Sequence, residues 1–155
     1  MKITVKRLRK SNLPLLQKRQ SFSDGSKNLY AYIASALFSS LVGTYLDLIF
    51  VGKGMYHFPV RLFPEIFTIN IVFTLVILPL STILFLFVAK RIRAFACFIM
   101  ILIISVVICF MEQFTEQLGW FIHHKEWNHA YSFFGYMLFL IIVWKFFRFC
   151  CQNIH

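Results

Sequence analysis

Four long runs of apolar residues dominate the chain, and short polar connectors separate them. The runs cover residues 29–51, 66–89, 94–111 and 130–149. A helix rises 1.5 Å per residue, so about 20 residues cross the roughly 30 Å hydrocarbon core of a bilayer. The pattern therefore predicts an all-α, polytopic membrane protein with four transmembrane helices.

Two polar segments flank this transmembrane domain, which covers residues 29–149. Residues 1–28 are basic, with Ser-Asp-Gly-Ser at 23–26 predicting a loop, and residues 150–155 form a short C-terminal tail. A basic segment beside a span is attracted to anionic lipid head groups by about 1 kcal/mol per Lys or Arg near the surface. The residues expected to make this contact are Lys6, Arg7, Arg9, Lys10, Lys18 and Arg19.

The composition excludes several classes of protein. Only 14% of the residues are charged and 59% are hydrophobic, whereas a soluble domain has about 25% charged residues. The net charge of +10 would suit nucleic acid on a soluble fold, but here it adjoins membrane spans, so no nucleic-acid partner is expected. The four cysteines lack metal-ligand spacing, and there is no HExxH, GxSxG or Walker loop. We therefore expect no metal, no cofactor and no enzymatic activity.

The distribution of basic residues predicts the orientation. Thirteen of the sixteen Lys and Arg lie in the N-terminal tail, the 90–93 turn and the C-terminal end. Cytoplasmic segments carry this excess in membrane proteins, so both termini are expected in the cytoplasm. The connectors at 52–65 and 112–129 then lie outside, together with five of the six acidic residues.

The first span carries small residues at every fourth position, so they share one helix face. Such a face lets helix backbones approach closely in a membrane. In the same register follows Asp47, whose carboxylate should therefore point into a helix contact, since lipid-facing charge is costly. The expected packing residues are Ala31, Ser35, Ser39 and Gly43.

Two later helices carry local signals. Pro79 lies near the middle of the second span and should kink it. If that span is a regular helix, Asn70, Thr74 and Ser81 fall on nearly one inward face. Asn128 is a suitable N-cap for the fourth helix.

The polar segment after the third span is the expected functional region. If the third helix continues, Glu112, Glu116, Gly119, His123 and Glu126 fall within about 40° of one direction. The simplest interpretation is an interfacial segment anchored by tryptophans, in which Asp47 and Glu112 pair with Arg61 or Lys125. The candidate polar cluster comprises Asp47, Arg61, Glu65, Asn70, Glu112, Glu116, His123, Glu126, Trp127 and Tyr131.

Two alternatives remain open for this region. Intramembrane acids are typical of ion, proton or solute sites, which would make the chain a small transporter or channel component, perhaps dimeric. Helical spacing within Glu116, His123, Glu126 and His129 would also suit an outer metal site of a membrane enzyme. Carboxylate-bridged di-metal bundles need a second matching ligand set, and the sequence has none.

Three stretches carry a resemblance: YLDLIFVGKGMYHFPVR at 45–61, PEIFTINIVFTLVILP at 64–79 and EQLGWFIHHKEWNHAYSFFGYMLFLIIVWKF at 116–146. Together they resemble an uncharacterised family of small four-span membrane proteins from spore-forming Firmicutes, such as bacilli and clostridia. The resemblance covers about half of the chain and implies a bacterial plasma membrane, but no chemistry. The positions that carry it are Tyr45, Asp47, Glu116, Gly119, Trp127, Tyr131 and Ser132.

These patterns together predict a non-enzymatic, multi-pass membrane protein. It is expected to act by assembly or interaction through an outer face rich in aromatic and acidic residues. Its expected partners are the lipid bilayer with its anionic head groups and either a second copy or another membrane protein.

Overall fold

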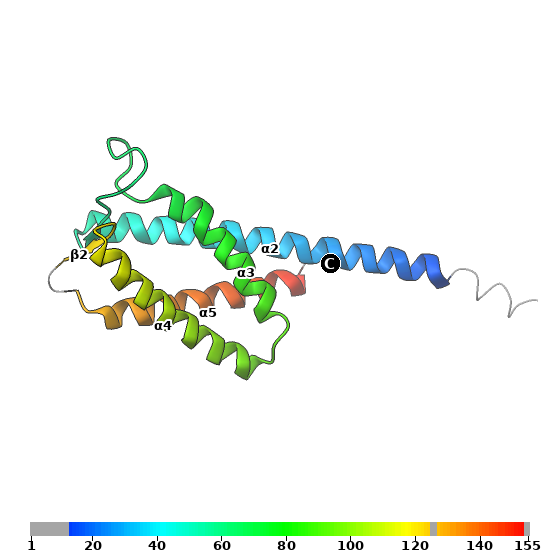
Figure 1. The fold of residues 1–155 in the computed structure, drawn as a ribbon. Coiled ribbons are helices and arrows are strands. Elements are labelled where there is room, and N and C mark those ends of the chain that lie inside the picture. The colour runs from blue at the N-terminus through cyan, green and yellow to red at the C-terminus, as the bar shows by residue number, and fades with distance from the viewer. Residues whose placement is uncertain (1–12, 125–126, 154–155) are drawn as a thin grey trace, which may run out of the picture.

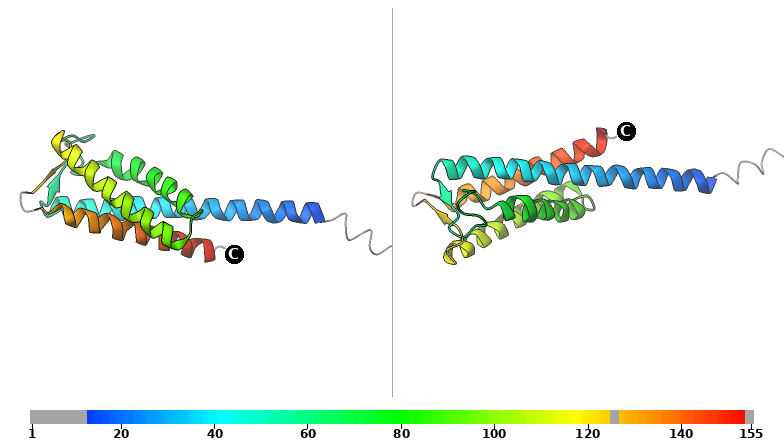
Figure 2. Two further views of the ribbon diagram at one scale, coloured as in Figure 1. Left: turned by 60° about the horizontal axis from the view of Figure 1, so that its bottom comes forward. Right: turned by 90° about the horizontal axis from the view of Figure 1, so that it is seen from above.

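The computed structural model describes residues 13–124 and 127–153, and the chain is mostly helical (Figure 1). Two short strands lie at one end of the helical bundle, and the first and last described residues lie toward the other (Figures 1 and 2). We call the strand-bearing end the polar end. The elements are α2 (Leu13–Gly52), β1 (Tyr56–His57), the π-helix η1 (Phe73–Ile77), α3 (Leu78–Ala89), α4 (Ala94–Gln117), β2 (Ile122–His123) and α5 (His129–Asn153).

Among the described residues, three helices are long and apolar enough to cross a membrane. These are Asn28–Gly52 within α2, α4 and α5, and a shorter apolar helix covers Phe73–Ala89. The second span predicted at 66–89 therefore begins too early. Arg61 holds the residues before this helix in a loop. Its guanidinium donates hydrogen bonds to three loop carbonyls: Phe58 at 2.5 Å, Phe67 at 2.6 Å and Pro64 at 3.1 Å.

The N-terminal segment is more helical than the sequence predicts. α2 runs unbroken from Leu13 for 40 residues, so the loop predicted at 23–26 is wrong. Pro14 falls in the first helical turn, where its missing N–H has no intrahelical partner to lose, and a helix once nucleated extends at little cost. Of the expected lipid-contacting residues, Lys18 and Arg19 lie on this helix, while Lys6, Arg7, Arg9 and Lys10 lie outside the described residues.

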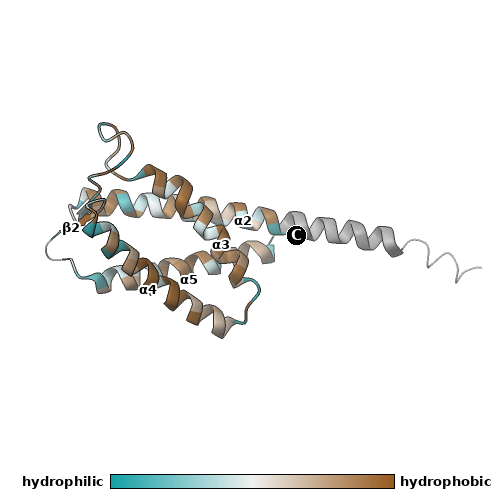
Figure 3. Ribbon diagram, viewed as in Figure 1, coloured by the Kyte–Doolittle hydropathy of each residue, from teal (hydrophilic) through white to brown (hydrophobic). Residues whose placement is uncertain are grey.

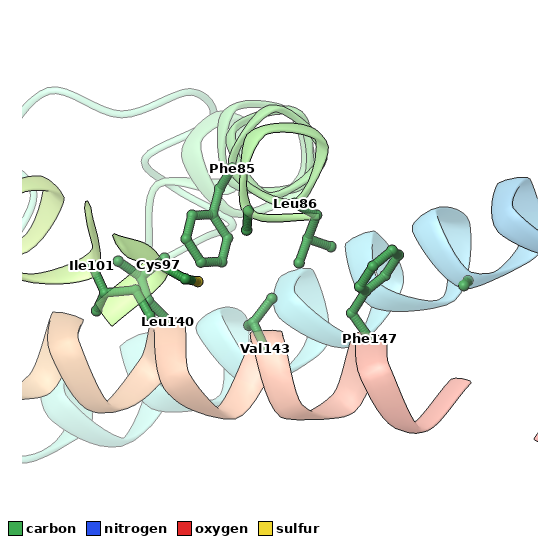
Figure 4. Packing of buried hydrophobic residues seen from close by; sticks show 9 residues of the cluster. Phe85, Leu86, Cys97, Ile101, Leu140, Val143 and Phe147 are labelled. Atoms are coloured by element: carbon green, nitrogen blue, oxygen red, sulfur yellow. The ribbon is translucent and has the colours of Figure 1, made fainter. Parts of the chain in front are cut away.

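The apolar core lies away from the polar end. α2 packs against α3 and α5, and α4 packs against α5. Figure 4 shows side chains of α3, α4 and α5 meeting in this core, with Val143 of α5 between Leu86 and Leu140. Figure 3 shows that hydrophobic positions run along the helices and polar positions gather at the strands and in the turn after α3.

The small-residue face of α2 is used inside the bundle. Ala31, Ser35 and Ser39 are completely buried. A Cβ atom added at Gly43 would lie 2.3 Å from Cδ2 of Leu78. The terminal methyl group of Leu78 thus occupies the space that a side chain at residue 43 would need.

A π-helical turn precedes Pro79. In η1 the amide of Leu78 donates to the carbonyl of Phe73, five residues earlier. The next bond of this kind would need an amide on Pro79, which has none. The carbonyl of Thr74 instead accepts a hydrogen bond of 2.8 Å from the Oγ of Ser40 in α2. The irregularity that Pro79 predicts is thus present as a π turn whose free carbonyl is satisfied by the neighbouring helix.

This turn changes which residues face inward. Thr74 and Thr82 are buried, whereas Ser81 is exposed, so the inward position predicted for Ser81 is wrong. A π turn contains an extra residue, which moves the inward position two turns later from 81 to 82. There Thr82 donates a hydrogen bond of 2.9 Å to the Oγ of Ser39.

The two connectors of the polar end pair with each other. β1 and β2 are antiparallel, with Tyr56 opposite His123 and His57 opposite Ile122. α4 ends at Gln117, and Gly119 adopts a positive φ of 72°, a conformation that glycine adopts readily and that often ends a helix. The helical continuation predicted through Glu126 is therefore wrong, and the chain folds back toward α5.

Candidate functional site

The candidate site centres on Glu112, near the end of α4. This residue is 7% exposed, and its carboxylate accepts hydrogen bonds from two α5 side chains one turn apart. The Oγ of Ser132 donates to Oε1 at 2.6 Å, and the hydroxyl of Tyr136 donates to Oε2. A buried carboxylate is costly unless it is paired and hydrogen-bonded, so α5 supplies partners for both oxygens.

His123 of β2 lies between two carboxylates. Its side chain is 4% exposed; Nε2 lies 2.9 Å from Oε1 of Glu112, and Nδ1 lies 3.2 Å from Oε2 of Glu116. The backbone amide of His123 also donates to Oε1 of Glu116 at 3.1 Å. Burial of the ring lowers its pKa, but the contacts with Glu112 and Glu116 outweigh burial and raise the pKa of His123 above its ordinary value.

The geometry leaves two ring nitrogens incompletely satisfied. Among the residues that the structure describes, Nε2 of His123 and Nδ1 of His129 are buried and make no hydrogen bond. The contact of His123 with Glu112 is an ion-pair contact by distance. Nδ1 of His129 lies 4.0 Å from Oε1 of Glu112. One ring nitrogen of each histidine and one carboxylate oxygen of Glu112 lie within 4.8 Å of one another.

Aromatic rings cover the site on the side of the strands. The indole of Trp127 stacks on the His123 ring with centroids 5.0 Å apart, and its Nε1 donates to Ser132 at 3.1 Å. Phe121 meets the same imidazole edge-on at 4.4 Å. Tyr56 contacts both His123 and Trp127. These rings keep water from the imidazole and fix its plane.

A second acidic residue of the polar end, Asp47, is also turned inward. Its Oδ1 accepts a hydrogen bond of 2.5 Å from the hydroxyl of Tyr56, while its Oδ2 is buried without a hydrogen-bond partner. Burial, followed by the negative charge of Asp47, raises the pKa of Tyr56 far above its ordinary value. Tyr56 therefore acts only as a neutral hydrogen-bond donor to Asp47.

The structure brings only part of the predicted cluster together. Glu112, Glu116, His123 and Trp127 share one site. Arg61 binds its own loop, Glu65 is exposed, and Oδ1 of Asn70 accepts a bond from the Phe73 amide at the start of η1. The predicted pairing of Asp47 and Glu112 with Arg61 is thus wrong: tyrosine, serine and histidine are their partners.

Two further residues lie at the margin. Tyr131 is 63% exposed and touches the site through an edge contact with Trp127. Glu126 and Lys125 lie outside the described residues, so the predicted role of Glu126 and the alternative pairing with Lys125 are not addressed by the structure.

The polar cluster predicted from the sequence lacks four members of the site, Tyr56, His129, Ser132 and Tyr136, although His129 belongs to the alternative metal site. Three of them carry a usable signal, because His129, Ser132 and Tyr136 recur at intervals of three and four residues and so share one face of the fourth helix. That face starts at the capping residue Asn128, whose Oδ1 accepts a bond of 2.9 Å from the Ala130 amide, as predicted. Tyr56 has no such signal, because its contact depends on pairing between distant connectors.

The site thus combines a buried carboxylate, two imidazoles and neutral hydroxyl donors, a set that can hold a proton or a cation.

No protein-family model, curated protein or solved structure matches the chain.

Proposed function

We propose that this chain is a four-span, non-enzymatic membrane protein that acts by binding another membrane protein through its polar end. In this proposal Phe73–Ala89, lengthened by adjoining residues, crosses the membrane as the second of the four spans in chain order. Both termini are cytoplasmic. The basic N-terminal segment lies against anionic lipid head groups of a bacterial plasma membrane.

One observation carries the proposal: the polar end exposes large aromatic side chains on its surface, beside an acidic residue that is buried. Trp120 is 55% exposed and Tyr45 is 64% exposed, whereas Glu112 is buried. The β1–β2 pairing fixes the connector that carries Trp120 relative to the helices. Exposed Trp and Tyr on a fixed backbone are the residues that contribute most to protein interfaces.

Site-specific photocrosslinking tests this proposal. A photoreactive phenylalanine at Trp120, expressed in native membranes, should form a discrete protein adduct. The same probe at Phe95, which is 78% exposed at the other end of α4, should react with lipid. A second copy of the chain in the adduct would identify a homo-oligomer, and lipid adducts alone at Trp120 would refute the interaction.

Alkaline phosphatase fusions test the orientation. This enzyme is active only outside the cytoplasm, where its disulfides form. Fusions after His57 and after Lys125 should therefore be active, and a fusion after Lys90 should be inactive. Inactivity at both of the first two positions would reverse the proposed topology.

A second candidate function is a small ion-coupled transporter or channel component. It is favoured by the burial of two acids, Asp47 and Glu112, near the ends of two apolar helices. In vesicles, such a protein would conduct protons or cations, and Asp47→Asn would abolish the flux. Unchanged leakage between protein-containing and empty vesicles would exclude it.

A further inference from the structure

We propose that the polar end holds one divalent transition-metal ion of the zinc class, bound by Oε1 of Glu112, Nε2 of His123 and Nδ1 of His129. The sequence leaves an outer metal site open on Glu116, His123, Glu126 and His129, whereas the structure brings Glu112, His123 and His129 together. This inference does not depend on the proposed partner, because the ion would bind within a single chain.

The first argument is the ligand set and its spacing. Two imidazoles and a carboxylate are the donors of many three-ligand zinc sites. Ligand atoms about 2.0–2.2 Å from a tetrahedral zinc ion lie about 3.4 Å from one another. The glutamate oxygen lies 2.9 Å from one imidazole nitrogen and 4.0 Å from the other. Small rotations of the rings would equalise these separations.

The second observation is that both nitrogens are buried and make no hydrogen bond within the part of the chain that the structure describes. Oε1 of Glu112 lies near both of them, at 2.9 Å from Nε2 of His123 and at 4.0 Å from Nδ1 of His129. Buried polar atoms almost always have partners, and an exception calls for an explanation such as an ion. A metal ion between the three ligands would satisfy both nitrogens at once.

The third argument is the support around the ligands. Glu116 contacts Nδ1 of His123, which leaves Nε2 free to bind, and this carboxylate–histidine arrangement accompanies most zinc-bound histidines. The carboxylate of Glu112 is itself oriented by Ser132 and Tyr136. Trp127 bonds to Ser132 and stacks on His123, so one residue fixes two of the ligands.

The ion also has a route into the site. The side chain of His129 is 42% exposed, and it lines an open surface hollow together with Gln113, Glu116 and Gln117. Three protein ligands leave a fourth position of a tetrahedral ion for water. The hollow lies on the His129 side, where such a water would reach solvent.

Zinc binding by the full-length protein in detergent tests the proposal. After chelator treatment and removal of the chelator, titration with Zn²⁺ should show one ion per chain. Removal of an outer-shell partner costs about 10- to 100-fold in affinity, so Glu116→Gln should weaken binding by that factor. His129→Ala removes a half-exposed ligand and should weaken binding further. Co²⁺ in place of Zn²⁺ should give the visible absorption of a four-coordinate site, and His129→Ala should remove it.

The matched control is His57→Ala, which removes an exposed histidine of the same end and should leave binding unchanged. Absence of a stoichiometric ion in the unmodified protein would overturn the proposal. So would equal affinity in the His129→Ala variant, which would assign the ion to other residues. Because no partner is present in this experiment, its failure would leave the crosslinking result at Trp120 unaffected.

Discussion

The α2–α3 contact and the α4–α5 contact both bury polar side chains, but the chemistry differs. Between α2 and α3, neutral hydroxyls bond to each other or to a carbonyl: Thr82 to Ser39, and Ser40 to the Thr74 carbonyl. Between α4 and α5 the buried group is a carboxylate, Glu112, with three side-chain partners around it.

The difference shows which contact serves packing and which forms a site. Hydroxyl bonds between membrane helices average about 0.6 kcal/mol each, so a neutral contact survives the loss of one member. A buried charge needs all its partners, because removal of one leaves the charge uncompensated. A buried carboxylate carries a desolvation cost that a buried hydroxyl does not, and helix packing alone does not require it.

The largest expected effect comes from breaking the charged contact. His123→Ala removes the closest ion-pair partner of the buried Glu112, 2.9 Å from its Oε1, and should lower the free energy of unfolding by about 3–5 kcal/mol. Chemical unfolding in mixed micelles, followed by circular dichroism with a chelator present, measures this loss. Adding Glu112→Gln should restore part of the stability. A loss below about 1 kcal/mol, equal to that of His57→Ala, would show that the α4–α5 contact is no more demanding than the α2–α3 contact.

A smaller effect is expected from crowding the α2–α3 contact. Gly43→Ala places a methyl group against Leu78, and overpacking of this kind costs about 1–3 kcal/mol. The pair Gly43→Ala and Leu78→Ala should be less destabilised than the sum of the two single variants. Gly135→Ala in α5 is the control, because a Cβ there meets no atom within 4 Å. It should be neutral or slightly stabilising, and equal destabilisation at both glycines would refute the close-approach argument.

The smallest effect is expected from a single hydroxyl. Thr82→Val keeps the side-chain volume but removes the bond to Ser39, which should cost about 0.6 kcal/mol in the unfolding free energy. The same unfolding assay in micelles resolves the comparison with His123→Ala. Ser81→Ala provides the control, because that residue is exposed. A larger loss at Ser81 than at Thr82 would contradict the register imposed by the π turn.

The sequence predicts the helices well because their signals are local. Hydrophobic runs locate α4 and α5 nearly to the residue at their first turns, and the fourfold spacing identifies the buried face of α2. Glu112, Glu116 and His123 are also identified, but by an argument that fails, since α4 stops before His123. They meet because Gly119 reverses the chain and β2 returns it beside the same helix.

What the sequence does not predict depends on distant pairs of residues. The two short strands pair residues that are far apart in the sequence. Their register brings the hydroxyl of Tyr56 to Asp47 and the imidazole of His123 to Glu112. The π turn depends on a residue of another helix, because Ser40 of α2 donates a hydrogen bond to the free carbonyl of Thr74. Neither can be derived from periodicity, which describes one segment at a time.

The π turn of Phe73–Ile77 contains one residue more than a regular α-helical turn, directly before α3. Shortening the turn to regular α geometry would rotate the residues after Pro79 by about 100° relative to those before it, exchanging Thr82 for Ser81 beside Ser39. Both residues carry a hydroxyl, so each alignment offers a donor to α2. Either alignment of this helix therefore keeps a hydrogen bond to α2. Deletion of the extra residue would leave Thr82 itself beside Ser39, whereas a deletion within α4 or α5 would rotate every later side chain of that helix by about 100°.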